Sequence, residues 1–163
     1  MRFFISGIIQ GSQPGRELHD QGYRQELREY LRAHFPEAEV FDPVEHHPNS
    51  IDYAPEQARA VFLSDVAEAG RSDVIVAYLP SASMGTAIEM WHAYQRGIPI
   101  FTISPLGENW VVKLLSRRVF ASLADFGDFV ASGGLADILG AGNQGMRKPG
   151  NREMRKSGNR AYA

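Results

Sequence analysis

The sequence predicts a single α/β domain of the flavodoxin-like kind, with a doubly wound parallel sheet of five strands. Short apolar, β-rich segments alternate with longer segments of helical periodicity, an order that favours a parallel sheet covered by helices on both faces. The segment Asp73–Leu79, DVIVAYL, is apolar almost throughout, as expected of a strand buried on both faces. A chain of 163 residues suits one such domain, which we expect over residues 1–140.

Residues that turn or stop the chain bound the predicted strands. GSQPG follows the first apolar segment, and Pro105 and Gly107 follow the fourth. The five strands are expected at Arg2–Ile9, Glu39–Val44, Asp73–Leu79, Ile98–Ile103 and Val119–Ala121.

The helices are predicted from apolar residues that recur every three or four positions. Pro36 stops the first helix, Pro55 fits the first turn of the second, and Gly97 suits the position just after the third. The helices are expected at Glu17–Phe35, Pro55–Ala69, Thr86–Arg96, Trp110–Leu115 and Phe126–Leu139. The predicted core face of the third helix consists of Ala87, Met90, Trp91 and Tyr94.

The C-terminal segment, residues 141–163, differs in composition from the rest. MRKPGNRE is nearly repeated as MRKSGNRA, and the segment is basic with few apolar residues. Such a composition does not support a core, so we expect a flexible tail. A weak anion- or RNA-contacting arm and an arm that packs on a partner subunit remain alternatives.

Charge and cysteine content exclude several classes of function. The net charge of −2 gives no overall attraction to nucleic acid or to an anionic membrane, and neither is an expected partner. The absence of cysteine excludes disulfides, thiolate zinc sites and a cysteine nucleophile, and it favours a cytoplasmic protein. The start, MRFFISGIIQGS, is interpreted as a strand rather than a signal peptide.

The loops after the first four strands, residues 10–15, 42–50, 80–86 and 104–109, should meet at the edge where such sheets bind ligands. Glu89 follows the third of them, in SASMGTAIEM. Thr86-x-x-Glu89 fits a capping box, in which the glutamate serves only the helix start. The alternative is that Glu89 is a reagent beside an anion pocket formed by the first helical amides and Ser83.

The segment SDVIVAYLPSASMGTAIEMWHAYQRGIPIF, residues 72–101, resembles the core of the nucleoside 2-deoxyribosyltransferase superfamily. The matching features are an Asp-led apolar strand, a loop of small residues, Gly-Thr-x-x-Glu and a later Gly-x-Pro before a strand. ISGIIQGS near the N-terminus is similar to the family's first loop. The resemblance covers about residues 2–120 and implies cleavage of the bond between a nucleobase and C1′ of a sugar.

The resemblance implies catalytic roles for two carboxyl groups. Glu89 falls on the family's nucleophile, which attacks C1′ to form a glycosyl-enzyme ester. Helix-dipole stabilisation in a first turn would keep its pKa low and the group ionised. Asp65, eight residues before Asp73, falls on the group that protonates or orients the leaving base. Asp73 is interpreted as structural.

The residue six positions before the nucleophile favours one branch of the family. Transferases that use free nucleosides carry an aspartate there, whereas this chain has Ser83, as in the branch that hydrolyses nucleoside 5′-monophosphates. A hydroxyl accepts a phosphate that a carboxylate would repel. We therefore expect a nucleotide N-glycosidase, with a 2-deoxyribosyltransferase as the alternative. The expected substrate-binding residues are Gly7, Gln10, Gly11, Ser12, Ser83, Gly85 and Thr86.

The resemblance also implies a homodimer or higher homo-oligomer, in which a neighbouring subunit contributes to each site. Asn109 and Ser116 are the candidates for that contribution, although helix capping explains either residue. No metal or cofactor is expected. A metal site at His46 and His47 is disfavoured because adjacent histidines point apart. A non-catalytic FMN or nucleotide binder, a phosphoribohydrolase and an interaction module are the remaining alternatives.

Overall fold

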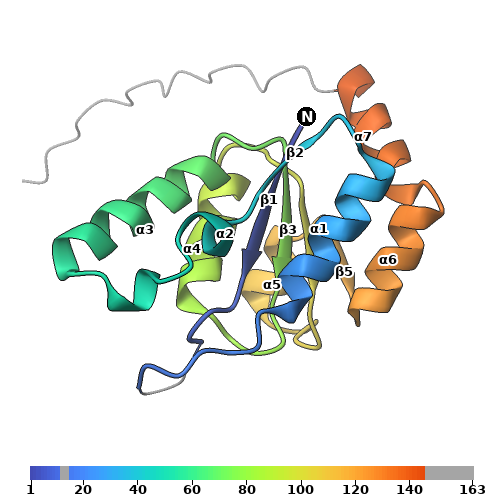
Figure 1. Cartoon of the computed structure of the whole chain (residues 1–163). Coiled ribbons are helices and arrows are strands. Elements are labelled where there is room, and N and C mark those ends of the chain that lie inside the picture. The colour runs from blue at the N-terminus through green and yellow to red at the C-terminus, as the bar shows by residue number, and fades with distance from the viewer. Residues whose placement is uncertain (12–14, 146–163) are drawn as a thin grey trace, which may run out of the picture.

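The predicted doubly wound sheet is confirmed by the computed structural model, which describes residues 1–11 and 15–145. All neighbouring strands are parallel, in the order β2-β1-β3-β4-β5 (Figure 1). This order reverses direction at β1, which is where ligands bind in flavodoxin-like sheets. The strands are β1 (Arg2–Gly7), β2 (Glu39–Phe41), β3 (Val74–Tyr78), β4 (Ile100–Ile103) and β5 (Arg118–Phe120).

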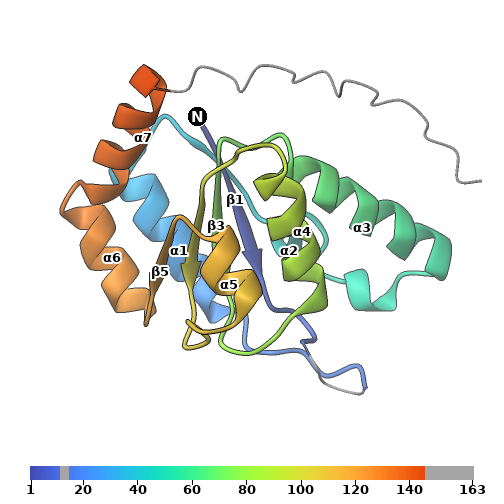
Figure 2. The same ribbon diagram turned by 180° about the vertical axis from the view of Figure 1, so that it is seen from behind.

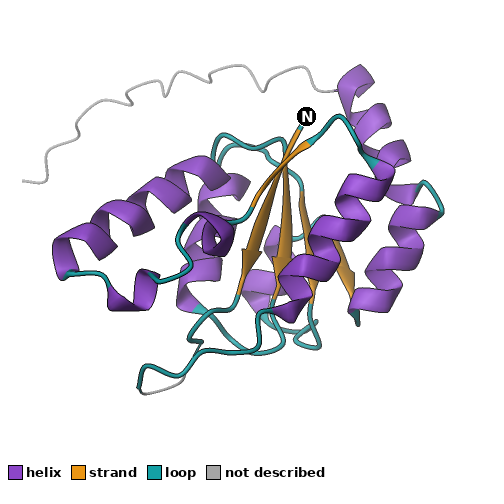
Figure 3. Ribbon diagram, viewed as in Figure 1, coloured by secondary structure: helices purple, strands orange, loops and turns teal. Residues whose placement is uncertain are grey.

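Helices cover both faces of the sheet. One layer contains α1, α6 and α7, and the opposite layer contains α3, α4 and α5, as the two opposed views show (Figures 1 and 2). The short helix α2 and the 3₁₀ turn η1 connect β2 to α3 (Figure 3). The helices are α1 (Gly22–His34), α2 (Pro43–His46), η1 (Ser50–Asp52), α3 (Pro55–Ala69), α4 (Met84–Tyr94), α5 (Trp110–Leu115), α6 (Leu123–Ala131) and α7 (Gly134–Gly145).

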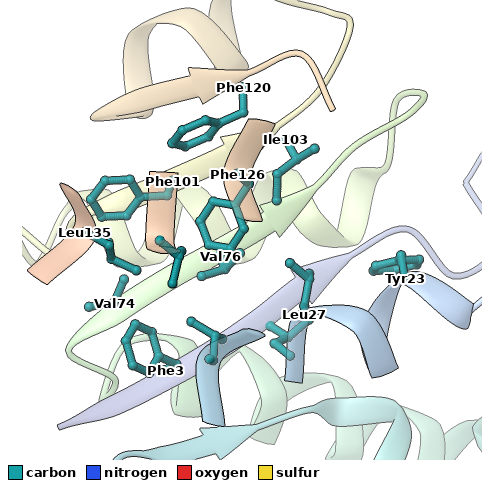
Figure 4. Packing of buried hydrophobic residues seen from close by; sticks show 13 residues of the cluster. Phe3, Tyr23, Leu27, Val74, Val76, Phe101, Ile103, Phe120, Phe126 and Leu135 are labelled. Carbon is teal, nitrogen blue, oxygen red and sulfur yellow. The ribbon is translucent and has the colours of Figure 1, made fainter. Parts of the chain in front are cut away.

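The core consists of two apolar clusters, one on each side of the sheet. Alternate side chains of a strand point to opposite faces, so Phe3 and Ile5 of β1 pack toward α1 and α6, while Phe4 packs toward α4. Figure 4 shows the first cluster, in which Phe126 of α6 and Leu27 of α1 lie against the strands. Apolar side chains on both faces of the strands therefore pack against the two helical layers.

Two expectations about chain segments were wrong. Residues 42–50 were expected to form a loop, but they contain α2, because Asp42 caps this helix by accepting a hydrogen bond from Val44 N at 3.1 Å. The single helix predicted over Phe126–Leu139 is two helices, α6 and α7. Gly133 separates them with φ of +81°, a conformation that a side chain disfavours.

The predicted core face of α4 was also wrong in part. Trp91 and Tyr94 are 51% and 49% exposed. The helix begins at Met84 rather than Thr86, and its buried face is rotated from the predicted one. The buried residues are Thr86, Glu89, Met90 and Ala93. Glu89 therefore lies on the face that packs against the sheet, where a carboxylate needs a specific reason to be buried.

Helix α7 extends to Gly145, so residues 141–145 of the expected tail are helical. Residues 146–163, with the basic repeat, lie outside the described residues, as does Ser12 of the predicted phosphate loop. None of the helices in the described part of the chain combines the length and the apolar character that a membrane crossing requires.

Candidate active site

A cavity of about 350 Å³ lies beyond the carboxyl ends of β1 and β3, at the predicted edge of the sheet. Its walls come from the loop after β1, the α2–η1 segment, α3 and the start of α4. The volume suits a small organic ligand. The predicted site residues that line this cavity are Gly7, Gln10, Gly11, Asp65, Ser83, Gly85, Thr86 and Glu89.

Glu89 is held by a neighbour from the far end of the sequence. The Ser6 hydroxyl of β1 donates a hydrogen bond to Glu89 Oε2, and both side chains are buried. Glu89 also lies in the second turn of α4, since the first turn contains no acidic residue. The capping-box interpretation is thus wrong, because the carboxylate bonds a strand residue rather than its own helix start.

Ser83, and not Thr86, is the N-cap of α4. Its Oγ accepts hydrogen bonds from Thr86 N at 3.4 Å and Thr86 Oγ1 at 3.1 Å. The Ser83 O–H donates to no other described residue, so this proton remains for a ligand in the cavity. Gly85 faces open space, and a side chain added there would meet nothing within 4 Å. The helix start consequently presents a hydroxyl and backbone amides to the cavity.

Burial raises the pKa of Glu89 to about 7. The cause is desolvation, which the hydrogen bond from Ser6 and the positive charge of Arg24 only partly offset, and the charge of Asp65 adds to the rise. The expectation of a low pKa in a first helical turn is therefore wrong. A carboxyl group that titrates near neutral pH is typical of a reactive site.

Asp65 reaches the same cavity from α3. Desolvation raises its pKa to about 6, against the lowering effects of His47, His46 and Arg24. The cavity thus brings together two carboxyl groups that titrate near neutral pH, with Asp65 and Glu89 on different helices. Such a pair can supply one carboxylate for attack and one carboxylic acid for proton donation.

The end of β1 and the loop that follows it approach the cavity at Gly7, Gln10 and Gly11. Gly7 has a clear packing reason, because a Cβ there would collide with the Tyr23 ring, whose hydroxyl donates to Ile8 O at 3.0 Å. The Gln10 amide donates to Gly15 O at 3.4 Å. The loop therefore provides backbone groups at the cavity edge, and Ser12 lies outside the described residues.

The sequence reasoning missed two polar residues of this site, Ser6 and Arg24. Ser6 is the polar residue in the apolar segment FFISGII. Arg24 lines the cavity and is 2% exposed, and it lies three residues before Leu27 on the buried face of α1. A polar residue at a core position of a strand or helix was the available signal in both cases.

An apolar wall was missed as well. Ile51 of η1 and Val61 and Phe62 of α3 line the cavity, together with Ile9 from the loop after β1. Residues 42–50 were treated as a loop, so their continuation into a wall of the cavity was not anticipated. The wall gives the cavity an apolar side, while the start of α4 provides a polar one.

The remaining candidate residues do not line this cavity. Asn109 caps α5, with Oδ1 accepting from Val111 N at 3.0 Å, and Ser116 Oγ lies 2.7 Å from Thr102 Oγ1. Within the described residues, no three His, Asp or Glu side chains are grouped to hold a metal ion. His46 stacks on Phe41 at the end of β2.

The sequence profile of the nucleoside 2-deoxyribosyltransferase family matches residues 11–137, most of the chain. The chain belongs to this family. The family acts by transfer or cleavage at N-glycosyl bonds, so the cavity with Glu89 and Asp65 lies in an enzyme of that general chemistry. No curated protein matched the sequence.

Two of the similar solved structures share the fold of this family member. A 2-deoxyribosyltransferase from Bacillus psychrosaccharolyticus is 18% identical with a TM-score of 0.59, and the match covers 78% of this chain and 91% of that one. A conserved protein from Enterococcus faecalis V583 is 22% identical with a TM-score of 0.58, over 80% and 97% of the two chains. A CMP N-glycosidase, BcmB, from Clostridium botulinum is 15% identical with a TM-score of 0.47, and the match covers 81% of this chain and 99% of that one.

Proposed function

We propose that this family member is a nucleotide N-glycosidase, which hydrolyses a nucleoside 5′-monophosphate to a free base and a (deoxy)ribose 5-phosphate. The observation that carries the proposal is the buried carboxylate of Glu89 in a cavity that also contains Asp65 and the Ser83 hydroxyl. The residues supply a nucleophile, an acid and an anion-binding helix start in one space.

The proposed reaction has two displacements at C1′. A Glu89 oxygen attacks C1′ while the bond to the base nitrogen breaks, and the proton on Asp65 goes to the departing base. The product is a glycosyl ester of Glu89. Water then attacks C1′, loses a proton to the Asp65 carboxylate, and releases the sugar phosphate and the Glu89 carboxylate.

The two sides of the cavity suit the two ends of a nucleotide. The Ser83 O–H and the free amides at the start of α4 favour a phosphate, whereas a carboxylate at position 83 would repel it. The apolar side chains of Ile51 and Phe62 suit the faces of a base. Gly85 leaves room for the ligand to approach the α4 backbone.

Base release from dCMP, dGMP and CMP, compared with the corresponding nucleosides, tests the proposal. Each reaction is run with and without an acceptor base, and Glu89→Gln is the inactive control. Hydrolysis of monophosphates without acceptor is expected. Turnover of free deoxynucleosides alone, and only with an acceptor, would support a 2-deoxyribosyltransferase instead. A yellow purified protein without base release would favour an FMN-binding module.

The proposed enzyme works as a homodimer through an apolar face formed by α4 and α5. Met84 is 80% exposed, Trp110 is 78% exposed and Leu114 is 62% exposed, while Trp91 is half exposed. Exposed apolar groups on adjacent helices are typical of an interface with another protein copy. Met84 also lines the cavity, so a second subunit on this face would lie at the entrance to the site.

Asn109 and Ser116, at the two ends of α5, are the residues proposed to reach the neighbouring site.

A further inference from the structure

Arg24 is a buried cation in the wall of the cavity, with no assigned role in the reaction. Its side chain is 3% exposed, although an arginine is rarely buried without a reason. The guanidinium makes four hydrogen bonds, so its position is fixed. The acceptors are Gln21 Oε1 at 2.7 Å, Ile5 O at 3.3 Å, Asp42 Oδ1 at 2.8 Å and Gly7 O at 3.0 Å.

We propose that Arg24 is a positioning residue for the reaction. Its fixed guanidinium charge stabilises the carboxylate forms of Glu89 and Asp65, and its hydrogen bond to Gly7 O holds the last residue of β1 at the edge of the cavity. The inference rests on the proposed function, because it assigns Arg24 to the same site.

The charges around Arg24 do not cancel. Asp42 is fully buried and bonds both Arg24 and Arg28, so two guanidinium groups share one carboxylate. Arg28 is more exposed than Arg24 and is not part of the cavity wall. Asp42 therefore offsets the charge of Arg24 only in part, and water screens the remainder weakly at this buried position.

Several other groups face Glu89 and act on its proton. Ser6 of β1 donates a hydrogen bond to it, Asp65 of α3 opposes its ionisation, and Tyr23 of α1 is a neutral neighbour because burial raises its pKa well above the ordinary value. Arg24 is the cation among these neighbours in the described residues. It also favours the charged form of Asp65, together with His46 and His47. Removing its charge should make both carboxyl groups harder to ionise.

The test compares Arg24→Gln, Arg24→Lys and Arg28→Met. Arg24→Gln removes the charge but keeps donor groups, and it is expected to move the pH profile of base release upward by about one pH unit. Arg24→Lys keeps the charge, so its profile should stay near the wild-type position while the KM rises. Arg28→Met removes the other Asp42 partner, which lies outside the cavity, so it should shift the profile less than Arg24→Gln does.

A second readout does not depend on activity. NMR titration of ¹³C-labelled Glu and Asp side chains follows the two carboxyl groups directly, with Glu89→Gln and Asp65→Asn used for assignment. Both groups are expected to titrate at higher pH in Arg24→Gln. If the wild type releases base from no nucleotide, the proposed function fails, and the titration still decides the effect of Arg24.

If Arg24→Gln fails to fold, Asp42→Asn tests the proposal, because it is expected to shift the two carboxyl titrations in the opposite direction. Asparagine still caps α2, while Arg24 loses the carboxylate that offsets its charge. Both reactive carboxyl groups should then titrate at lower pH than in the wild type. The proposal is overturned if folded Arg24→Gln titrates like the wild type, if Arg28→Met shifts the carboxyl groups as far, or if Asp42→Asn moves them upward.

Discussion

Ser6 Oγ donates a buried hydrogen bond to Glu89 Oε2, linking β1 to α4 at the floor of the cavity. The bond stabilises the charged form of Glu89, since an O–H donates most strongly to a carboxylate. It also fixes which oxygen of Glu89 is engaged, so that the other is available to a ligand. Ser6 and Glu89 together therefore determine both the orientation and the ionisation of the proposed nucleophile.

Ser6→Ala should lower kcat/KM for base release by about tenfold at pH 7. A hydrogen bond to a charged group contributes about 1.5–3 kcal/mol, and its loss disfavours ionised Glu89. Ser72→Ala is the matched control, because Ser72 is also buried and donates to Glu68 O away from the cavity. Equal losses in the two variants would show that the effect is structural rather than specific to the site.

The pH dependence of base release should be bell-shaped, with its maximum between about pH 6 and pH 7. Burial raises the pKa of Asp65 to about 6 and that of Glu89 to about 7, and the two groups interact. The singly protonated pair holds its proton mainly on Glu89, whose pKa is the higher, and the reactive form is the minor one with the proton on Asp65 and Glu89 ionised. The ratio of these two forms does not change with pH, so activity follows the amount of the singly protonated pair. Activity falls at lower pH because both groups are protonated, and at higher pH because both are charged.

Steady-state kinetics from pH 5 to pH 9 measure this profile. Asp65→Asn provides the comparison, since it should weaken activity and remove the decrease at high pH. The substrate phosphate, with a second pKa of about 6, affects the wild type and the variant alike. Activity that stays level from pH 7 to pH 9 in the wild type would contradict the role of Asp65 as the acid.

Glu89→Gln should stabilise the protein, and more so as the pH rises. The folded-state pKa of Glu89 is about 7 against an ordinary value of 4.5, so the folded protein holds this proton more tightly than the unfolded chain. The cost of ionising Glu89 therefore develops between pH 4.5 and pH 7. The variant avoids a cost of about 3 kcal/mol at pH 8 and little at pH 4.5.

Denaturant unfolding at pH 4.5 and pH 8 measures this difference in the free energy of unfolding. Glu68→Gln is a control of opposite sign, because the hydrogen bonds from Arg2 and Arg71 lower the pKa of Glu68. That substitution should destabilise the protein at pH 8 and have less effect at acid pH. A Glu89→Gln variant that is less stable than the wild type at pH 8 would contradict the burial argument.

Trp110→Glu combined with Leu114→Glu should convert the proposed dimer to a monomer. The charges would be placed in the apolar interface, where burial is costly. Sedimentation velocity measures the mass, and Leu18→Glu, at an exposed leucine outside α4 and α5, should leave it unchanged. A wild-type protein that sediments as a monomer at tens of micromolar would contradict the proposed homodimer.

The sheet was predictable because its strands are mostly apolar segments between turn residues. The segment DVIVAYL became β3 with both faces buried, and the alternation of strands and helices gave the parallel order. Strand ends were less predictable, since β1 stops at Gly7 rather than Ile9. Apolar residues can continue past the last paired residue into a wall of the cavity, as Ile9 does.

The position of the site was predictable, but its interactions were not. The fold brings the end of β1, α3 and the start of α4 together, so Asp65, Ser83 and Glu89 meet as expected. The bonds of Ser6 and Arg24 depend on side-chain geometry between distant segments. The cap of α4 was misplaced because both Ser83 and Thr86 are good N-cap residues, and only the turn itself distinguishes them.

Ser6 and Glu89 are 83 residues apart in the sequence, so base release can report when these two distant segments have come together during folding. During synthesis, Glu89, the proposed nucleophile, lacks the hydrogen bond from Ser6 until α4 has emerged and docked on β1. The onset of base release would then time the docking of two halves of the sheet in a refolding experiment. A tight-binding substrate analogue would trap only chains that have completed this step, and would protect them from unfolding.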